Sequence, residues 1–444
     1  MTKIDPTTAW RPFIASAERP WSNRLAAHLL RRAGFGGTIH QIESARKSGL
    51  PETLDLLFNS SSADSYNEEM AIAGRMISSN QDARSLAAWW LLRMVQTPCP
   101  LIEKMTLFWH GHFATGADKV NDARAMLRQN ILLRKHALGK FEPLVQAISR
   151  DVAMLVYLDS TDNRKTRPNE NYARELMELF CLGPGNYTER DIKEIARCFT
   201  GWEVRRGKFR FNSHQHDKGS KSFLGETGDY DGDDAVRIVL QQEASAKFIC
   251  RKLIRFFVFD DEQIPDELVA PLADSLRRSG FDIGQTVRTI LSSEIFYSDK
   301  AIARKIKSPV ELAIGFLRFF DCSVNMQQLS NRLAQLGQLP LYPPNVKGWD
   351  GGRNWINAST ILARTNLIVD LATSGNTKFR SGSLSEWAKS TPRVATNNNH
   401  RWIDEYMFAQ PLPEVARQKI NQMKATEIEQ LVSWLVALPE FQLN

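Results

Sequence analysis

Residues 188–199 read Thr-Glu-Arg-Asp-Ile-Lys-Glu-Ile-Ala-Arg-Cys-Phe, a pattern typical of an amphipathic helix. Thr188 and Asp191 have the spacing of a capping box, in which each side chain bonds the other residue's backbone amide. Apolar residues such as Ile192 and Ile195 then recur at the spacing of one helix face. The stretch therefore predicts a helix that begins after Thr188 and buries one face.

The same periodicity dominates the remaining chain. We expect further helices within residues 125–158, 234–259 and 309–320, where apolar residues recur on one face. Runs that alternate apolar and polar residues are scarce, so few strands are expected beyond a short hairpin near residues 207–225. The sequence therefore predicts a mainly α, multi-helical protein with long loops.

The chain gives no sign of a boundary between independent domains. Its 444 residues, 43% hydrophobic and 24% charged, are typical of a globular protein with a large core. No linker divides them, so residues 1–444 are predicted to form a single helical body. Ser, Thr and Asn are concentrated over residues 376–400, which are predicted to be an exposed loop or insertion within that body.

Charge and cysteine usage limit the classes of partner and compartment. The formal charge of +7 comes from 57 Lys and Arg against 50 Asp and Glu. Both signs are interspersed, which argues against nucleic-acid binding. No apolar run is long enough for a membrane helix, and the first residues lack the apolar segment of a signal peptide. Five cysteines without a C-x-x-C pair suit a reducing compartment, so we expect a cytoplasmic protein.

The first segment that could carry chemistry is His-Gly-His at residues 110–112. Histidines two residues apart point to different sides of a helix, but Gly111 would let the chain leave the helix there. His110 and His112 would then face one pocket, as a metal site or an acid–base pair requires. The alternative is a pair of helix-end histidines that bond backbone carbonyls.

The second segment covers residues 168–183 and reads as a helix between Pro168 and a Gly-Pro pair. Asn171, Glu175 and Glu178 fall on one face, with Arg174 beside them. Two carboxylates next to an arginine suit general acid–base catalysis or a divalent cation, and Asn171 and Arg174 would contact substrate. A solvated helix face with an ordinary ion pair would look the same.

The third segment packs two histidines, one aspartate and two lysines into residues 214–221. A loop of this kind would supply a base from His216 or Asp217, and cations for an anionic group from Lys218 and Lys221. A polar surface loop is the alternative.

The fourth segment, residues 342–357, combines glycine turns with tryptophans and basic residues. Trp349 offers a flat apolar face and Lys347 a cation, so both are candidate substrate-binding residues. A loop packed on the core would have the same composition. Near the start of the chain, Arg31 and Arg32 precede Ala-Gly-Phe-Gly-Gly, which predicts a helix terminus and turn without the strand context of a phosphate-binding loop.

Taken in order, these segments resemble the recurring motifs of the bacterial family known as domain of unknown function 1800. The resemblance covers roughly residues 20–444 and rests on residues 28–36, 108–113, 169–176, 187–192, 200–202, 216–225, 307–311 and 343–349. It implies a largely helical fold without an agreed activity. Genes of this family often neighbour those of family 1501, which resembles sulfatases, so a protein of that kind is the implied partner. Many relatives are exported, so export with a partner that carries the signal is the alternative to the cytoplasm.

Two functions follow as hypotheses. In the first, the histidine, glutamate and His216 segments converge on one cleft and hydrolyse or transfer a group on an anionic substrate. A divalent cation such as zinc, manganese or iron would be its candidate cofactor. In the second, the chain is a non-catalytic chaperone or scaffold for the sulfatase-like partner, and the loop at residues 343–355 anchors the interface.

Overall fold

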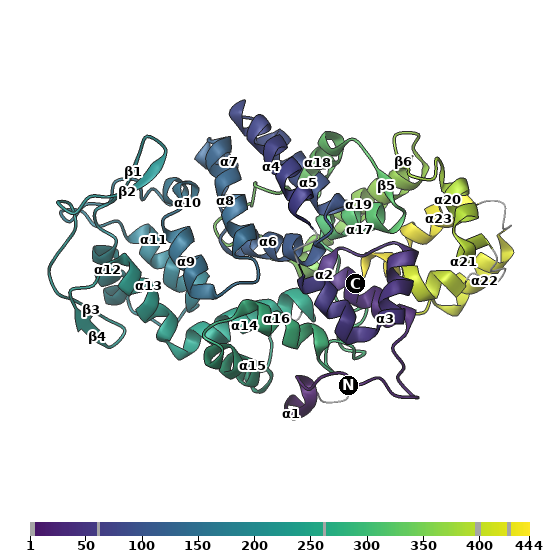
Figure 1. Ribbon diagram of the computed structural model, residues 1–444, viewed down its shortest axis with the longest axis horizontal. Helices are drawn as coiled ribbons and strands as arrows, with labels where there is room; N and C mark the ends of the chain where they lie inside the picture. Colours follow the sequence, from purple (N-terminus) through teal and green to yellow (C-terminus); the bar gives the residue numbers. More distant parts are fainter. Residues whose placement is uncertain (1–4, 60–62, 261–262, 396–400, 424–427) are drawn as a thin grey trace.

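The computed structural model describes residues 5–59, 63–260, 263–395, 401–423 and 428–444. Helices make up most of this part of the chain, which confirms the predicted mainly α class (Figure 1). The first helices are α1 Pro6–Ala9, α2 Asn23–Gly34, α3 Ile39–Phe58, α4 Asp64–Ser79, α5 Ala83–Gln96, α6 Pro100–His112, α7 Ala117–Val120 and α8 Ala123–Lys135.

The middle of the chain contains helices and two β-hairpins. Its elements are α9 Phe141–Ser149, α10 Val152–Tyr157, α11 Glu170–Glu175, the π-helix η2 Leu176–Cys181, α12 Glu189–Cys198, β1 Trp202–Arg205, β2 Lys208–Phe211, β3 Lys221–Phe223, β4 Glu226–Gly228, α13 Gly232–Gln241, α14 Glu243–Phe257, α15 Asp266–Arg278 and α16 Ile283–Ser292.

The last part of the chain packs against the first helices. It contains α17 Pro309–Phe319, β5 Cys322–Ser323, α18 Met326–Gln335, the 3-10 helix η3 Gly352–Trp355, α19 Ala358–Thr373, β6 Lys378–Phe379, α20 Leu384–Ser390, α21 Pro392–Ala395, the π-helix η4 Ile403–Met407, α22 Glu414–Gln422, α23 Ile428–Ala437 and the 3-10 helix η5 Pro439–Gln442. Figure 1 shows the two hairpins at one end of the molecule and α20–α23 at the other.

Helix α12 forms as the sequence predicts. The Thr188 hydroxyl accepts a hydrogen bond from the Asp191 amide at 3.2 Å, and the Asp191 carboxylate accepts one from the Thr188 amide at 2.8 Å. This capping box satisfies amides that the first helical turn leaves without partners. Ile192 and Ile195 are fully buried, so the apolar face lies against the core.

Strands are few, as expected, but more numerous than predicted. The single hairpin predicted near residues 207–225 is two antiparallel hairpins, β1–β2 and β3–β4. A third short pair joins β5 to β6, which are far apart in the sequence. Each pair has two strands, so the core is made by helices.

Within residues 376–400, predicted to be an exposed loop or insertion, the structure has two helices, α20 and α21, so a loop does not describe residues 384–390 and 392–395. The Ser383 hydroxyl caps α20 by accepting from the Glu386 amide at 3.1 Å. Trp387 is buried, and its ring centroid lies 4.8 Å from that of Phe320. Burial of the large Trp387 ring therefore stabilises a helix in a stretch whose composition is typical of loops. Residues 396–400 lie outside the described part of the chain.

The buried apolar side chains form two hydrophobic cores. Helix α6 contributes Met105 and Trp109 to one core and Leu107 to the other. Helix α2 does the same, with Leu29 in the first core and Ala26 in the second. These two helices therefore lie between the cores. Packing on both sides holds the helices in place, and with them their polar residues.

A buried ionic network fixes the first turns of α6. The Glu103 carboxylate accepts hydrogen bonds from Arg93 at 2.6 Å, from Arg134 at 2.6 and 2.9 Å, and from the Trp90 indole at 3.0 Å. Burial alone would raise the pKa of Glu103, but the charges and hydrogen bonds of Arg134 and Arg93 outweigh it and lower the pKa to about 2. The carboxylate is therefore ionised throughout the neutral range.

We expect Glu103→Gln to lower the free energy of unfolding by about 3–5 kcal/mol, because Arg93 and Arg134 keep buried charges without a counter-ion. The folded pKa of about 2 lies below the ordinary value of 4.5. The stabilisation is therefore complete above about pH 4.5 and is lost as the pH falls towards about 2. Urea unfolding should show a large difference from wild type at pH 7 and a smaller one at pH 3.

The matched control is Glu69→Gln, since Glu69 is exposed on α4. This variant should stay within about 0.5 kcal/mol of wild type at both pH values. Equal stability of the Glu103→Gln and Glu69→Gln proteins would contradict the role assigned to the buried network.

Candidate functional site

A cavity of about 250 Å³ lies between the end of α6, helix α14, the start of α17 and the loop after α18; we call it the α6–α14 cavity. Aromatic side chains in its wall come from Phe108, Phe256, Trp349 and Trp355. Its charged lining residues are Lys252, Arg255, Lys305 and Lys347, with Asp260, Glu311 and Asp350. The cavity therefore combines flat apolar faces with both signs of charge, and cations predominate.

The two histidines of the first segment do not face one pocket. Helix α6 continues through Gly111 to His112, so the helix break expected at Gly111 is absent. His110 Nε2 accepts a hydrogen bond from the Leu341 amide at 3.0 Å, whereas the His112 ring contacts Phe180 and Phe248. The rings point to different sides because the helix keeps its turn of about 100° per residue.

Burial keeps the His110 ring neutral and lowers its pKa to about 3. His112 is also buried, and burial together with the nearby Lys252 charge lowers its pKa well below the ordinary value. His112 Nε2 lies 3.0 Å from the Phe180 carbonyl oxygen and therefore donates its hydrogen to it. His112 Nδ1 is left as an acceptor for the Lys252 ammonium, at 3.1 Å.

This geometry does not fit a metal held by His110 and His112. Both ring nitrogens of His112 are engaged, and His110 holds a backbone amide. Within the described ranges, no group of three or more His, Cys, Asp or Glu side chains is placed to hold a metal ion. The predicted histidine metal pair is therefore replaced by two separately bonded rings.

Lys252 is held at the wall of the α6–α14 cavity by two hydrogen bonds. Its ammonium donates to His112 Nδ1 and, at 3.1 Å, to the Leu179 carbonyl in the π-helix η2. Burial lowers the pKa of Lys252 to about 8. Single π-helical turns inside helices occur frequently at functional sites. The hydrogen bond from Lys252 to Leu179 connects η2 to the wall of the cavity.

Neither carboxylate of the second segment lines this cavity, but Glu175 has a lining residue, Lys347, as an electrostatic neighbour. Glu178 accepts a hydrogen bond from the Tyr187 hydroxyl at 3.2 Å. Burial and the Glu178 charge raise the pKa of Glu175. The charges of Arg174 and Lys347 act in the opposite direction but are smaller in effect. Because Lys347 also lines the α6–α14 cavity, the second and fourth segments are neighbours, although they are far apart in the sequence.

The other polar residues of the second segment face elsewhere. Arg174 forms a bidentate pair with Glu189, with nitrogen–oxygen distances of 2.8 and 2.9 Å. Asn171 donates to the Leu158 carbonyl at 3.4 Å. Neither residue lines the α6–α14 cavity, so the structure gives them bracing contacts where the sequence predicts substrate contacts.

The fourth segment closes the cavity against α6. Gly348 has a φ of +80°, and a Cβ at this position would clash with the Gly111 carbonyl oxygen. The Trp349 indole donates to the Gly337 carbonyl at 2.9 Å, which fixes its ring over Gly111. Trp349 and Lys347, the candidate substrate-binding residues of this segment, both line the α6–α14 cavity.

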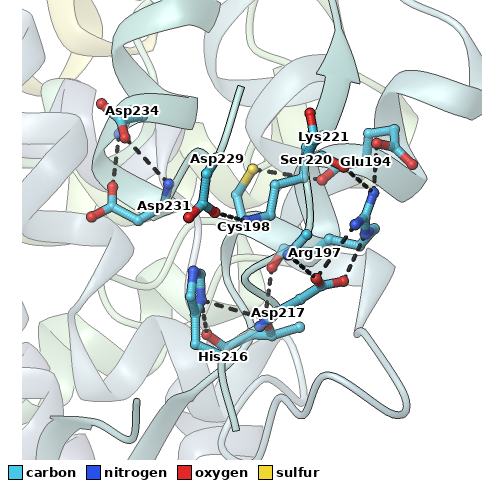
Figure 2. A network of polar contacts seen from close by, with 12 residues as sticks. Glu194, Arg197, Cys198, His216, Asp217, Ser220, Lys221, Asp229, Asp231 and Asp234 are labelled. Atoms are coloured by element: carbon cyan, nitrogen blue, oxygen red, sulfur yellow. Dashed lines mark hydrogen bonds and ion pairs between the residues drawn. The ribbon is translucent and has the colours of Figure 1, made fainter. Parts of the chain in front are cut away.

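The third segment forms a network of its own with helix α12 (Figure 2). Asp217 accepts from the Arg197 guanidinium at 2.7 Å, and Lys221, whose side chain is fully buried, pairs with Asp229 at 2.9 Å. His216 Nδ1 donates to a carbonyl oxygen of the neighbouring turn, at 2.9 Å.

Carboxylates of α12 also hold the backbone that follows this segment. Glu194 accepts from the Ser222 amide and Asp191 from the Leu224 amide, both at 2.9 Å. Asp217, through Arg197, and the two carboxylates of α12 thereby attach the β3–β4 hairpin to that helix. His216 and Lys221 bond residues outside α12, and Lys218 is exposed. None of the four candidate residues of this segment lines the α6–α14 cavity, so the three segments do not converge there as expected.

Several lining residues were not found by sequence reasoning, namely Lys252, Arg255, Asp260 and Lys305. Lys252 and Arg255 belong to a basic, amphipathic stretch that reads as a solvated helix face. The contact that marks Lys252 as a site residue is visible only in the folded structure, because its partner His112 lies 140 residues away in the sequence. The segment at residues 307–311, which contributes Glu311, was found only through the family resemblance.

The fold and cavity define a class: a large helical protein with a polar, cation-rich cavity between two hydrophobic cores. Residues 28–443 match the family described as "Protein of unknown function (DUF1800)", and the chain belongs to this family. No curated protein and no solved structure matches the chain. In the parts of the chain that the structure describes, no helix is both long and apolar enough to cross a bilayer.

We expect Gly348→Ala to displace the loop from α6 and to lower the free energy of unfolding by about 1–3 kcal/mol. The added methyl group meets the Gly111 carbonyl oxygen, and φ is in the left-handed region. The tryptophan fluorescence spectrum should shift as Trp349 loses its packing on Gly111. The matched control is Gly375→Ala, where a Cβ meets nothing within 4 Å. A Gly348→Ala protein that behaves like this control would refute the close approach.

Proposed function

We propose that the chain is a hydrolase or group-transfer enzyme that acts on a small anionic substrate in the α6–α14 cavity. The observation that carries this proposal is the cationic lining, made by Lys252, Arg255, Lys305 and Lys347. Clustered ammonium and guanidinium groups favour phosphate, sulfate or carboxylate, and the tryptophans suit the apolar part of a ligand.

The four cations divide into two pairs. Lys305 is paired with Asp260 at 2.9 Å, and Lys252 is hydrogen-bonded to His112. Arg255 and Lys347 are exposed and form no ion pair with the residues that the structure describes. We assign Arg255 and Lys347 to binding the anionic group, because their donors are available to a ligand.

We assign proton transfer to Lys252. A group with a pKa of about 8 exchanges its proton readily near neutral pH, as acid–base catalysis requires. His112 and the Leu179 carbonyl accept two of its hydrogen bonds and hold the ammonium at the cavity wall. His112 is thus a positioning residue, since it acts through Lys252.

Glu175 is our candidate for the second acid–base group. Burial and the Glu178 charge raise its pKa, so the carboxyl group binds a proton more readily than an exposed glutamate does. Lys347 is its electrostatic neighbour and connects it to the α6–α14 cavity. Hydrolysis needs one group to activate the nucleophile and one to protonate the leaving group, and Lys252 and Glu175 would share these roles.

A non-catalytic partner of a sulfatase-like protein of family 1501 is the second candidate. Lys347, Asp350 and Arg353 are exposed around the half-buried Trp349, and this mixture is typical of an interface anchor. Co-purification of the two co-expressed proteins as a complex would support it. Four buried cysteines, Cys181, Cys198, Cys250 and Cys322, form no disulfide, which fits our proposal that the protein works in the cytoplasm.

We expect turnover of at least one of nitrophenyl phosphate, nitrophenyl sulfate and nitrophenyl acetate. Lys252→Met should lower kcat about 100-fold or more, and should remove a limb near pH 8 from the pH–rate profile. Lys347→Met should act mainly on KM and raise it about tenfold, because it removes a binding charge. Steady-state kinetics over the pH range would measure all three effects.

Lys218→Met serves as the matched control, since Lys218 is an exposed lysine outside the cavity. It should leave kcat and KM unchanged. Turnover that survives Lys252→Met undiminished, with the limb near pH 8 intact, would exclude Lys252 from the reaction. Failure of all three esters, together with a stable complex with the family 1501 protein, would favour the partner role.

A further inference from the structure

The inner wall of the α6–α14 cavity carries neutral polar groups to which the proposed function gives no role. Gln338 and Ser308 line the cavity, and both residues are buried. Trp355 lines it as well and is 9% exposed. The cations Arg255 and Lys347 are exposed lining residues, so they lie at the mouth. The cavity therefore has a charged mouth and a neutral, polar inner wall.

The side-chain amide of Gln338 has a fixed orientation. Its Oε1 accepts a hydrogen bond from the Val310 amide, in the first turn of α17, at 2.9 Å. Only the carbonyl end of a glutamine side chain can accept such a bond, so Nε2 is the other end. Nε2 donates to no described residue and is not sealed from solvent. Its hydrogens are therefore available at the cavity wall.

Two further donors at this wall have no acceptor. The Trp355 indole nitrogen donates to no described residue, and a Cβ on the lining residue Gly351 would lie 4.0 Å from it. The Ser308 hydroxyl accepts from the Glu311 amide at 3.2 Å but donates to no described residue. Donors of buried residues are costly unless water or a ligand accepts from them. The inner wall is therefore suited to a ligand that carries several acceptor atoms.

The size and the aromatic faces of the cavity indicate a ligand with one ring. An apolar cavity of about 150 Å³ holds one benzene molecule. The α6–α14 cavity, at about 250 Å³, therefore has room for one six-membered ring and one small anionic group. Phe108, Phe256, Trp349 and Trp355 supply flat apolar faces for such a ring. A nucleotide or a peptide is larger than this space.

The charges determine which end of the ligand faces inwards. Glu311 lines the inner wall, where the buried Lys104 is its ion-pair partner, and its carboxylate repels a second anion. At the mouth, the exposed Asp350 offsets only one of the two charges of Arg255 and Lys347. The anionic group of a ligand therefore stays at the mouth, and the ring reaches the inner donors.

We propose that the substrate is a monosaccharide that carries one phosphate or sulfate ester, an inference that rests on the proposed function. The ester group binds Arg255 and Lys347, and ring hydroxyl oxygens accept from Gln338 Nε2 and Trp355 Nε1. An aryl ester fills the same space, but its ring displaces water from these donors without replacing the hydrogen bonds. The inner wall therefore favours a hydroxylated ring over an aromatic one.

Isothermal titration calorimetry with the wild-type protein tests this substrate class. The ligands are the phosphate and sulfate esters, on the primary hydroxyl, of glucose, galactose, mannose and N-acetylglucosamine. Inorganic phosphate, inorganic sulfate and phenylphosphonate serve for comparison. At least one sugar ester should bind about tenfold more tightly than all three, because only a sugar pairs the inner donors. The tighter of the two ester series identifies the anionic group.

Trp355→Phe keeps an aromatic face but removes the indole donor. It should weaken binding of the tightest sugar ester about tenfold and leave binding of the inorganic anions unchanged. The matched control is Trp434→Phe, which alters a half-buried tryptophan of α23 outside the cavity and should change neither affinity. If Trp355→Phe fails to fold, wild-type crystals with the tightest sugar ester replace it. A ring hydroxyl should then lie within hydrogen-bond distance of Gln338 Nε2.

Turnover of a nitrophenyl ester on the same samples separates this inference from the proposed function. Turnover without tighter binding of any sugar ester would overturn the sugar class alone. Equal weakening of sugar-ester and inorganic-anion binding by Trp355→Phe would also overturn it. A protein that binds none of the ligands and turns over no ester would overturn both proposals. Tight binding of a sugar ester without any turnover would confirm the ligand class and contradict the enzymatic role.

Discussion

The ion pair between Lys104 and Glu311 is the contact on which the rest of the structure depends. Both side chains are almost completely buried, and they join α6 to the first turn of α17. Glu311 also completes the capping box of α17 through the Ser308 amide. Loss of either partner would leave an uncompensated charge between the two hydrophobic cores, which is among the most destabilising changes a protein can suffer.

Glu311 of this pair lines two cavities with different properties. One is the α6–α14 cavity, and the other is a smaller cavity between α2 and α17 with a largely apolar wall. On one side, exposed Arg255 and Lys347 leave donors that a ligand from solvent can reach. On the other side, Arg31 and Lys307 are buried in the lining of a cavity of about 30 Å³. One carboxylate, already paired with Lys104, is thus shared by the linings of both cavities.

The sequence predicted what depends on local pattern. The capping box at Thr188 and the apolar face of α12 follow from spacing alone, and so does the mainly α class. The position of Trp349 and Lys347 at a cavity could also be anticipated, because glycine turns with aromatic and basic residues typify ligand loops. The Ser-, Thr- and Asn-rich composition of residues 376–400 favours a loop, and it hides the helix α20 that the Ser383 cap begins and Trp387 anchors in the core.

The rest of the candidate site depends on tertiary pairing that a single sequence does not contain. A histidine two residues from another can face the same pocket or the opposite side, depending on whether Gly111 breaks the helix. Asp217, one of the two candidate bases in its segment, is paired with Arg197 on α12, which is distant in the sequence pattern that suggested it. Lys252 gains its low pKa only because distant segments bury it, and no spacing in the sequence reports that burial.

Crystals of the unmodified protein soaked in sodium tungstate would test most directly whether the α6–α14 cavity binds anions, as we propose. An anomalous tungsten peak is expected inside the cavity, within hydrogen-bond distance of Arg255 or Lys347. Tungsten peaks confined to other surfaces, with the cavity holding only water, would contradict it.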